Sequence, residues 1–281
     1  MPTVRLPDGR SLPALGLGTW RMGERSAARA TEIAVIRHAL DQGLTLFDTA
    51  EMYGDGGAET VLGEALAGRR DAAFIVSKVL PSNASYGGTL AACARSLQRL
   101  RTEYIDLYLL HWRGGVPLAE TVAAFEHLRS QGKIGGWGVS NFDTDDLTEL
   151  AGVQGGAQCQ TNQVYYALAQ RDPAYALLPA MGAADMPVMA YSPLDEGRLA
   201  THPALVPMAQ ALGVTPSQIA LAWLLTRTAQ PTGVLAIPKT TSIARLDENL
   251  GAIAVRLDAD ALTALDQVFA PPRRRRPLAM I

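Results

Sequence analysis

Short apolar, strand-like runs recur along the chain, and each ends on a polar or aromatic residue. The ends of successive runs lie 23 to 33 residues apart, except for one step of 48 residues between Tyr191 and Lys239. A strand, a loop and a helix together take about thirty residues, and parallel neighbouring strands require such a crossover. In chain order the runs end at Trp20, Asp48, Lys78, His111, Ser140 with Asn141, Gln163, Tyr191 and Lys239.

The intervals between the strand-like runs show helical patterns. Apolar residues recur there at three- and four-residue spacing, as at Ile33, Ile36, Ala39 and Leu40. The long interval holds two such segments, so we expect one helix more there than in the other units. The predicted helices are 26–41, 58–67, 89–100, 118–130, 144–150, 173–181, 202–212, 216–226, one beginning near Ser242, and 258–269.

Eight strand–helix units predict an α/β fold of the closed (β/α)8 TIM-barrel type, formed by residues 1–281 as a single domain. The opening segment carries a PDG turn and predicts a β-hairpin that caps the N-terminal mouth. Extra helices are expected after strands 7 and 8, followed by a C-terminal tail. In such barrels the chemistry lies on the rim formed by the C-terminal ends of the strands.

The composition of the chain disfavours some classes of binding partner. The net charge of −2 disfavours binding to nucleic acid or to an anionic membrane, and the basic run Arg273–Arg276 is typical of a solvated surface. The sequence shows neither a signal-peptide core nor a run of about 20 apolar residues. Two cysteines, Cys93 and Cys159, fit a reduced interior. We therefore expect a cytoplasmic, monomeric protein, and the absence of HExxH and CxxC patterns predicts no metal.

Four ionisable residues stand at or just past three consecutive strand ends: Asp48, Tyr53, Lys78 and His111. Each alone would fit a structural role, but core packing does not require such a set on one sector of a rim. A tyrosine beside an ammonium is a suitable proton donor, because the ammonium stabilises the phenolate and is expected to lower the phenol pKa. Asp48 would hold Lys78 charged, and His111 would bind the substrate oxygen.

Motifs along almost the whole chain resemble those of the aldo-keto reductase family. They are FDTAEMYGDG, VSKV, LYLLHW, WGVSNF, NQVYY, YSPL and IPKTTSIARLDEN, in that order. The rim segment DTAEMYGDGGAE and the tail are most similar to bacterial small-carbonyl reductases of the methylglyoxal type. The resemblance implies reduction of small aldehydes or ketones with NADPH, and a catalytic tetrad of Asp48, Tyr53, Lys78 and His111 in which Tyr53 is the general acid.

The resemblance also implies a set of residues that bind NADPH or NADP⁺. Arg, Lys and amide side chains suit the phosphates and the carboxamide of this cofactor. For Arg245 and Glu248, in the helix that begins near Ser242, the alternative to cofactor binding is an ordinary ion pair on the surface. By role, Ser140, Asn141 and Gln163 would hold the carboxamide, Tyr191 the nicotinamide ring, Ser192 and Leu194 the pyrophosphate, Lys239 and Arg245 the 2′-phosphate, and Glu248 and Asn249 the adenine. Thr240 is a further candidate for cofactor binding.

Trp20, Met52 and Trp112 are the candidates for the wall of the substrate pocket, with Glu51 in the same loop as Met52. The alternative for both tryptophans is core packing, the usual role of this residue. Trp137 and Trp223 are expected in the core.

Two other functions remain open from the sequence. One is an NADPH-binding sensor or regulatory protein of the same fold with little turnover. The other is a lyase that uses Lys78 as a Schiff-base nucleophile. The neighbouring Asp48 argues against the lyase, because it would keep Lys78 protonated.

Overall fold

The computed structural model describes residues 1–230 and 232–281. Within them eight parallel strands form one sheet in chain order. The backbone N–H groups of Gly16 and Gly18 donate to the carbonyls of Ala236 and Pro238, so the first strand closes against the last. The predicted closed barrel is confirmed. The strands are β3 (Leu17–Gly18), β4 (Leu46–Asp48), β5 (Phe74–Val79), β6 (Leu107–Leu110), β7 (Trp137–Ser140), β8 (Asn162–Tyr165), β9 (Val188–Tyr191) and β10 (Val234–Ala236).

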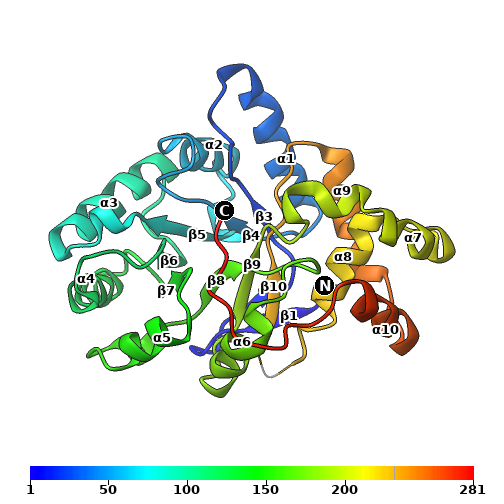
Figure 1. Ribbon diagram of the computed structural model, residues 1–281. Helices are drawn as coiled ribbons and strands as arrows, with labels where there is room; N and C mark the ends of the chain where they lie inside the picture. The colour runs from blue at the N-terminus through cyan, green and yellow to red at the C-terminus, as the bar shows by residue number, and fades with distance from the viewer. Residues whose placement is uncertain (231) are drawn as a thin grey trace.

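The helices surround the barrel, as Figure 1 shows. Every helix that the sequence predicts is present, with ends that differ by a few residues at most. Their apolar faces pack on the outer side of the strands and form the larger core, which includes Trp137 and Trp223 as predicted. The helices are α1 (Arg29–Asp41), α2 (Gly57–Ala65), α3 (Tyr86–Leu100), α4 (Leu118–Ser130), α5 (Thr144–Ala151), α6 (Pro173–Ala183), α7 (Val206–Leu212), α8 (Pro216–Leu225), α9 (Ile243–Gly251) and α10 (Ala259–Val268).

Side-chain caps fix several helix starts near the rim. Asp143 accepts hydrogen bonds from the N–H groups of the first turn of α5, and Thr215 does the same for α8, where Pro216 occupies the first helical position. Ser242 caps α9. These caps satisfy backbone N–H groups that have no partner within the helix.

The N-terminal hairpin consists of β1 (Thr3–Arg5) and β2 (Ser11–Pro13), paired antiparallel. Its apolar side chains Val4, Leu6 and Leu12 pack in a second core with inward residues of the barrel strands. Arg10 Nη1 also donates to the carbonyl of Asp106 at 3.0 Å. The hairpin therefore closes the N-terminal mouth, as predicted.

α7 is the extra helix in the long interval, and α10 follows the eighth unit. Beyond Phe269 the chain has no regular structure and turns inward, so the C-terminus in Figure 1 lies over the barrel strands. The tail therefore lies on the same side as the strands' C-terminal ends. Cys93 and Cys159 are buried free cysteines.

Among the residues that the structure describes, no single helix combines the length and the hydropathy needed to cross a membrane. Two segments, Pro203–Leu212 and Pro216–Leu225, have the required length and hydropathy only when taken together, and the two are bent by 84° relative to each other.

Candidate active site

The four ionisable residues meet at the C-terminal rim. Asp48 is the last residue of β4, Lys78 lies near the end of β5, and His111 directly follows β6. Because these strands are parallel neighbours, their ends lie at one edge of the sheet. Tyr53 reaches the same place from the turn after β4: its hydroxyl is 3.2 Å from Lys78 Nζ, and its ring meets the His111 ring edge-on at 5.8 Å. The structure thus brings together the predicted tetrad residues.

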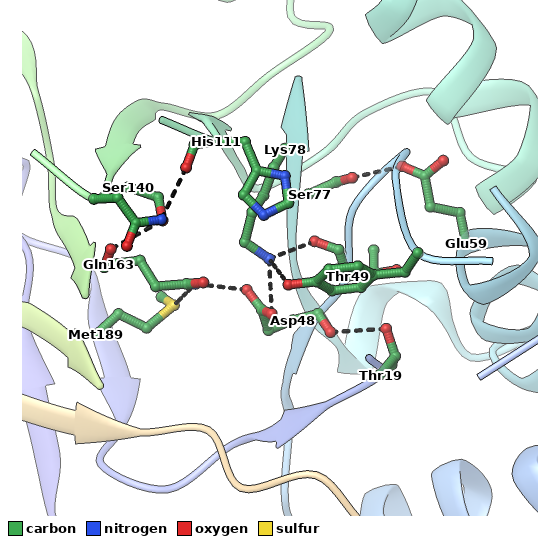
Figure 2. A network of polar contacts seen from close by, with 12 residues as sticks. Thr19, Asp48, Thr49, Glu59, Ser77, Lys78, His111, Ser140, Gln163 and Met189 are labelled. Carbon is green, nitrogen blue, oxygen red and sulfur yellow. Dashed lines mark hydrogen bonds and ion pairs between the residues drawn. The ribbon is translucent and has the colours of Figure 1, made fainter. Parts of the chain in front are cut away.

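Lys78 is the centre of this arrangement (Figure 2). Its ammonium donates to Asp48 Oδ2 at 2.8 Å, to the Thr49 carbonyl at 2.8 Å and to the Tyr53 hydroxyl at 3.2 Å. The side chain is fully buried, and Asp48 is almost so. An ammonium has three N–H donors, and all three are used here. The lysine therefore fixes the position of the tyrosine hydroxyl.

Burial dominates the electrostatics of the site. It raises the pKa of Asp48 and lowers the pKa of Lys78, while their mutual attraction opposes both shifts. Burial, followed by the Asp48 charge, raises the Tyr53 pKa well above 10. The expected lowering of the Tyr53 pKa by Lys78 is therefore wrong for this state, because burial of the phenol and, after it, the Asp48 charge shift the pKa in the opposite direction. The phenol is protonated at neutral pH, which is the form that a proton donor requires.

His111 is a neutral imidazole in this structure. Burial, with the nearby Lys78 charge as a second cause, lowers its pKa to about 2. Its Nδ1 atom is buried and has no hydrogen-bond partner among residues 1–230 and 232–281. The ring packs against Trp112, with centroids 4.9 Å apart. A neutral imidazole has one donor and one acceptor nitrogen, so it can hydrogen-bond a polar ligand without adding charge.

Ser140, Asn141, Gln163 and Tyr191 form a hydrogen-bonded group next to the tetrad. Tyr191 donates to Asn141 Oδ1 at 3.0 Å, and Asn141 Nδ2 donates to the His111 carbonyl at 3.2 Å. Ser140 Oγ donates to the Gln163 carbonyl at 2.9 Å. Asn141 has a φ of +58°, a left-handed conformation that non-glycine residues seldom adopt and that is concentrated at functional sites.

The Gln163 side chain joins this group to the tetrad. Its Nε2 atom donates to Asp48 Oδ1 at 2.7 Å and lies 2.8 Å from the Met189 sulfur, as Figure 2 shows. The amide thus holds the carboxylate oxygen that Lys78 leaves free. Sequence reasoning placed Gln163 at the site but gave it no contact with Asp48.

A small cavity of about 100 Å³ lies over two of the tetrad residues, Asp48 and Tyr53, whereas Lys78 and His111 do not line it. Its wall includes Trp20 and Met52, as predicted, but not Trp112, which packs beside His111 instead. Glu51 faces elsewhere: its carboxylate accepts from the Leu80 N–H at 2.8 Å and from Asn83 at 2.9 Å. The other wall residues are Gly18, Asp48, Tyr53, Asn141, Tyr191, Ser192, Ile237, Lys239 and Ile281.

A groove of about 650 Å³ adjoins this cavity, and the two share Trp20, Ser192 and Lys239. The predicted cofactor residues of the last two units line it. Besides the shared residues, these are Leu194, Thr240, Arg245, Glu248 and Asn249. Arg21, which sequence reasoning did not select, also lines the groove and stacks its guanidinium 4.5 Å from the Trp20 ring centroid.

The groove presents three exposed cations, Arg21, Lys239 and Arg245. Neither Lys239 nor Arg245 forms a side-chain ion pair within residues 1–230 and 232–281. Glu248 accepts instead from Thr215 Oγ1 at 2.6 Å. The alternative of a surface pair between Arg245 and Glu248 is therefore wrong. This end of the groove is suited to an anionic group.

A buried ion pair behind the tetrad was not found from the sequence. Glu59 of α2 is fully buried and accepts from Ser77 Oγ at 2.5 Å and from Arg99 Nε at 2.6 Å. Ser77 precedes Lys78 in β5. Glu59 and Arg99 lie 40 residues apart, on helices whose mutual packing no local pattern reveals.

Comparison with known proteins identifies the class of this barrel. The aldo/keto reductase family model matches residues 14–270. The chain is 48% identical to methylglyoxal reductase YeaE of Escherichia coli K12, over 96% of each chain. It is 35% identical to an aldo-keto reductase of Mycolicibacterium smegmatis, over 94% of this chain and 92% of the relative.

Solved structures agree with this assignment. An aldo/keto reductase from Klebsiella pneumoniae, crystallised with NADP and acetate, superposes with a TM-score of 0.96 at 47% identity, covering 100% of this chain and 99% of that one. A second structure described as an aldo-keto reductase from Klebsiella pneumoniae, in complex with NADPH, gives the same values. The chain belongs to the aldo/keto reductase family.

Proposed function

We propose that this protein reduces small aldehydes and ketones to alcohols with NADPH, and that Tyr53 is the general acid. The observation that carries the proposal is the position of the Tyr53 hydroxyl, 3.2 Å from the ammonium of the buried Lys78–Asp48 pair, in a residue that lines a small cavity. The similarity to a methylglyoxal reductase and to NADP-bound relatives supports the same class of reaction.

The residues present fit NADPH. The groove of about 650 Å³ is lined by Lys239 and Arg245, which form no ion pair among the described residues, and by Arg21. It shares Trp20, Ser192 and Lys239 with the cavity at Tyr53. Lys239 and Arg245 would hold the 2′-phosphate, with Thr240 beside them. Leu194 and Ser192 would border the pyrophosphate. Asn249 and Glu248 would border the adenine.

At the other end of the groove, Ser140, Asn141 and Gln163 would hold the carboxamide, and the Tyr191 face would carry the nicotinamide ring. Tyr191 already stacks on Tyr165, with centroids 5.8 Å apart and planes 15° from parallel. This contact fixes the ring from one side.

When bound, NADPH supplies the hydride that no side chain can supply. The chain's own residues then act on the carbonyl oxygen. Tyr53 and the neutral His111 would hydrogen-bond that oxygen, and Tyr53 would transfer its proton to it. Lys78, 3.2 Å from the phenol oxygen, would stabilise the phenolate that remains. Trp20 and Met52 would exclude water and limit the size of the substrate.

The lyase alternative lacks support. A Schiff-base lysine needs a free amine lone pair, whereas Lys78 uses three donor positions in hydrogen bonds. The sensor alternative differs from an enzyme only in turnover.

The test is the loss of NADPH absorbance with a panel of small aldehydes, ketones and dicarbonyls that includes methylglyoxal, with NADH in parallel. We expect rapid, carbonyl-dependent oxidation of NADPH. Tight NADPH binding with no oxidation by any carbonyl would contradict the enzyme and favour the sensor.

A further inference from the structure

The C-terminal tail reaches the tetrad cavity. In Figure 1 the last segment, drawn in red, leaves α10 and runs inward over the barrel. Its last residue, Ile281, lines the cavity together with Tyr53, Trp20 and Met52. Leu278 and Ala279 pack against the main core on the way. The tail therefore forms part of the substrate pocket of the proposed reductase.

The tail is held by ion pairs at the N-terminal ends of two helices. Arg275 Nη2 lies 2.7 Å from Asp145 Oδ2 and 3.0 Å from Asp143 Oδ2, and its Nη1 donates to Asp145 Oδ1 at 3.1 Å. Arg276 lies 3.8 Å from Asp172, the residue before α6. The basic run thus is on the surface, as expected from the sequence, but two of its members are paired.

Asp143, one of the two partners of Arg275, is itself held in place by hydrogen bonds. Asp143 caps α5: one carboxylate oxygen, Oδ1, accepts from the N–H groups of Asp145 and Asp146, which leaves Oδ2 for the arginine. Asp143 also lies two residues after Asn141, in the loop that leaves β7. A planar guanidinium that spans two carboxylates fixes orientation as well as distance.

We infer that Arg275 is a positioning residue that holds the tail across the cavity and thereby sets the size of carbonyl substrate that enters. This inference rests on the proposed function. Arg275 touches neither the tetrad nor the groove, so it acts only through the residues that follow it. Release of the guanidinium would remove the shorter of the two ion pairs of the tail and leave the Arg276–Asp172 pair and the packing of Leu278 and Ala279. The tail would be held less firmly, and Ile281 would leave the cavity wall more often.

The size of the effect follows from the exposure of the pair. Arg275 is 45% exposed, and its partners Asp143 and Asp145 are 36% and 78% exposed. Exposed ion pairs are weak and screened by salt, so the loss of this one corresponds to about a three- to fivefold change in the equilibrium constant between the closed and the open tail.

The experiment compares kcat/KM for methylglyoxal and for phenylglyoxal, at saturating NADPH, in the wild type and in Arg275→Gln. We expect the preference for the smaller substrate to fall about three- to fivefold, through opposite changes in the two KM values, with kcat for methylglyoxal nearly unchanged. Arg275→Lys should restore part of the preference. Arg274→Gln, a neighbouring arginine with no ion pair among the described residues, is the matched control and should behave as the wild type.

The salt dependence of the substrate preference provides a second test. Added KCl should lower the preference of the wild type more than that of Arg275→Gln, because the variant retains only the longer Arg276–Asp172 pair for salt to screen. Equal preferences in Arg275→Gln, Arg274→Gln and the wild type would overturn the inference.

A readout that needs no turnover separates this inference from the proposed function. If the wild type reduces no carbonyl, the proposed function fails, and limited trypsin digestion still tests the tail. Asp145→Asn keeps every arginine but removes a partner of Arg275, so the tail should be cut faster than in the wild type. Asp71→Asn, far from the tail, is the control. Equal digestion rates would show that the ion pair does not hold the tail.

Discussion

The ammonium of Lys78 lies 2.8 Å from the carboxylate of Asp48, and neither side chain is more than 3% exposed. Each charge is costly to bury alone, and each offsets the cost of the other. The pair therefore places a positive charge beside Tyr53 without a net charge in the barrel. The pair also contributes to the stability of the fold, because neither charge is buried without its counter-ion.

Removal of one member of this pair should destabilise the fold. Lys78→Met leaves Asp48 buried without its counter-ion, and we expect the free energy of unfolding to fall by about 3–5 kcal/mol. The double variant Lys78→Met/Asp48→Asn removes both charges and should recover part of that loss. Urea denaturation at pH 7 measures both. A Lys78→Met variant as stable as the wild type would contradict the account of a buried, mutually compensating pair.

His111 should make the stability depend on pH. Its pKa is lowered from an unfolded value near 6.5 to about 2, so between these values only the unfolded chain binds the proton. The contribution is fully present above pH 6.5 and is lost as the pH falls below it, by at most about 1.4 kcal/mol per pH unit.

Urea denaturation between about pH 5 and pH 8 checks this prediction, because the pKa of an unperturbed histidine lies within that range. The stability of His111→Gln relative to the wild type should improve as the pH falls below 6.5. Parallel stability curves for the two proteins would show that His111 is protonated equally in both states.

Lys239 and Arg245 should decide between NADPH and NADH. Hydrogen bonds to charged groups contribute about 1.5–3 kcal/mol, so Lys239→Met and Arg245→Gln should each lower kcat/KM for NADPH about tenfold or more. NADH lacks the 2′-phosphate, and its kcat/KM should change little. Arg5→Gln, on the N-terminal hairpin, is the control. An equal loss with both cofactors would mean that these cations do not recognise the 2′-phosphate.

The positions of the tetrad residues could be predicted because they follow from local patterns. Each strand is a short apolar run, and a parallel barrel brings the ends of neighbouring strands to one rim. Asp48, Lys78 and His111 therefore converge whatever the details of the packing. The helix caps Asp143, Thr215 and Ser242 are local signals of the same kind.

The remaining features depend on contacts between distant segments. Arg275 pairs with Asp145 across 130 residues, and Glu59 with Arg99 across 40, and no periodic pattern marks either contact. The direction of the Tyr53 pKa shift depends first on how deeply the phenol is buried and then on its distance from Asp48, and neither follows from the sequence pattern. The position of the Glu51 side chain could not be predicted for the same reason, since its partner Asn83 lies in the next strand–helix unit.

Tyr53→Phe tests the central claim most directly, because it removes one oxygen atom and leaves the ring, the groove and the cavity in place. Steady-state oxidation of NADPH by methylglyoxal should give a kcat lower by about 10²–10⁴-fold, with NADPH affinity, measured by fluorescence titration, within about threefold of the wild type. Tyr175→Phe, on the exposed face of α6, should show no change. Wild-type turnover in Tyr53→Phe would contradict the assignment of this hydroxyl as the proton donor.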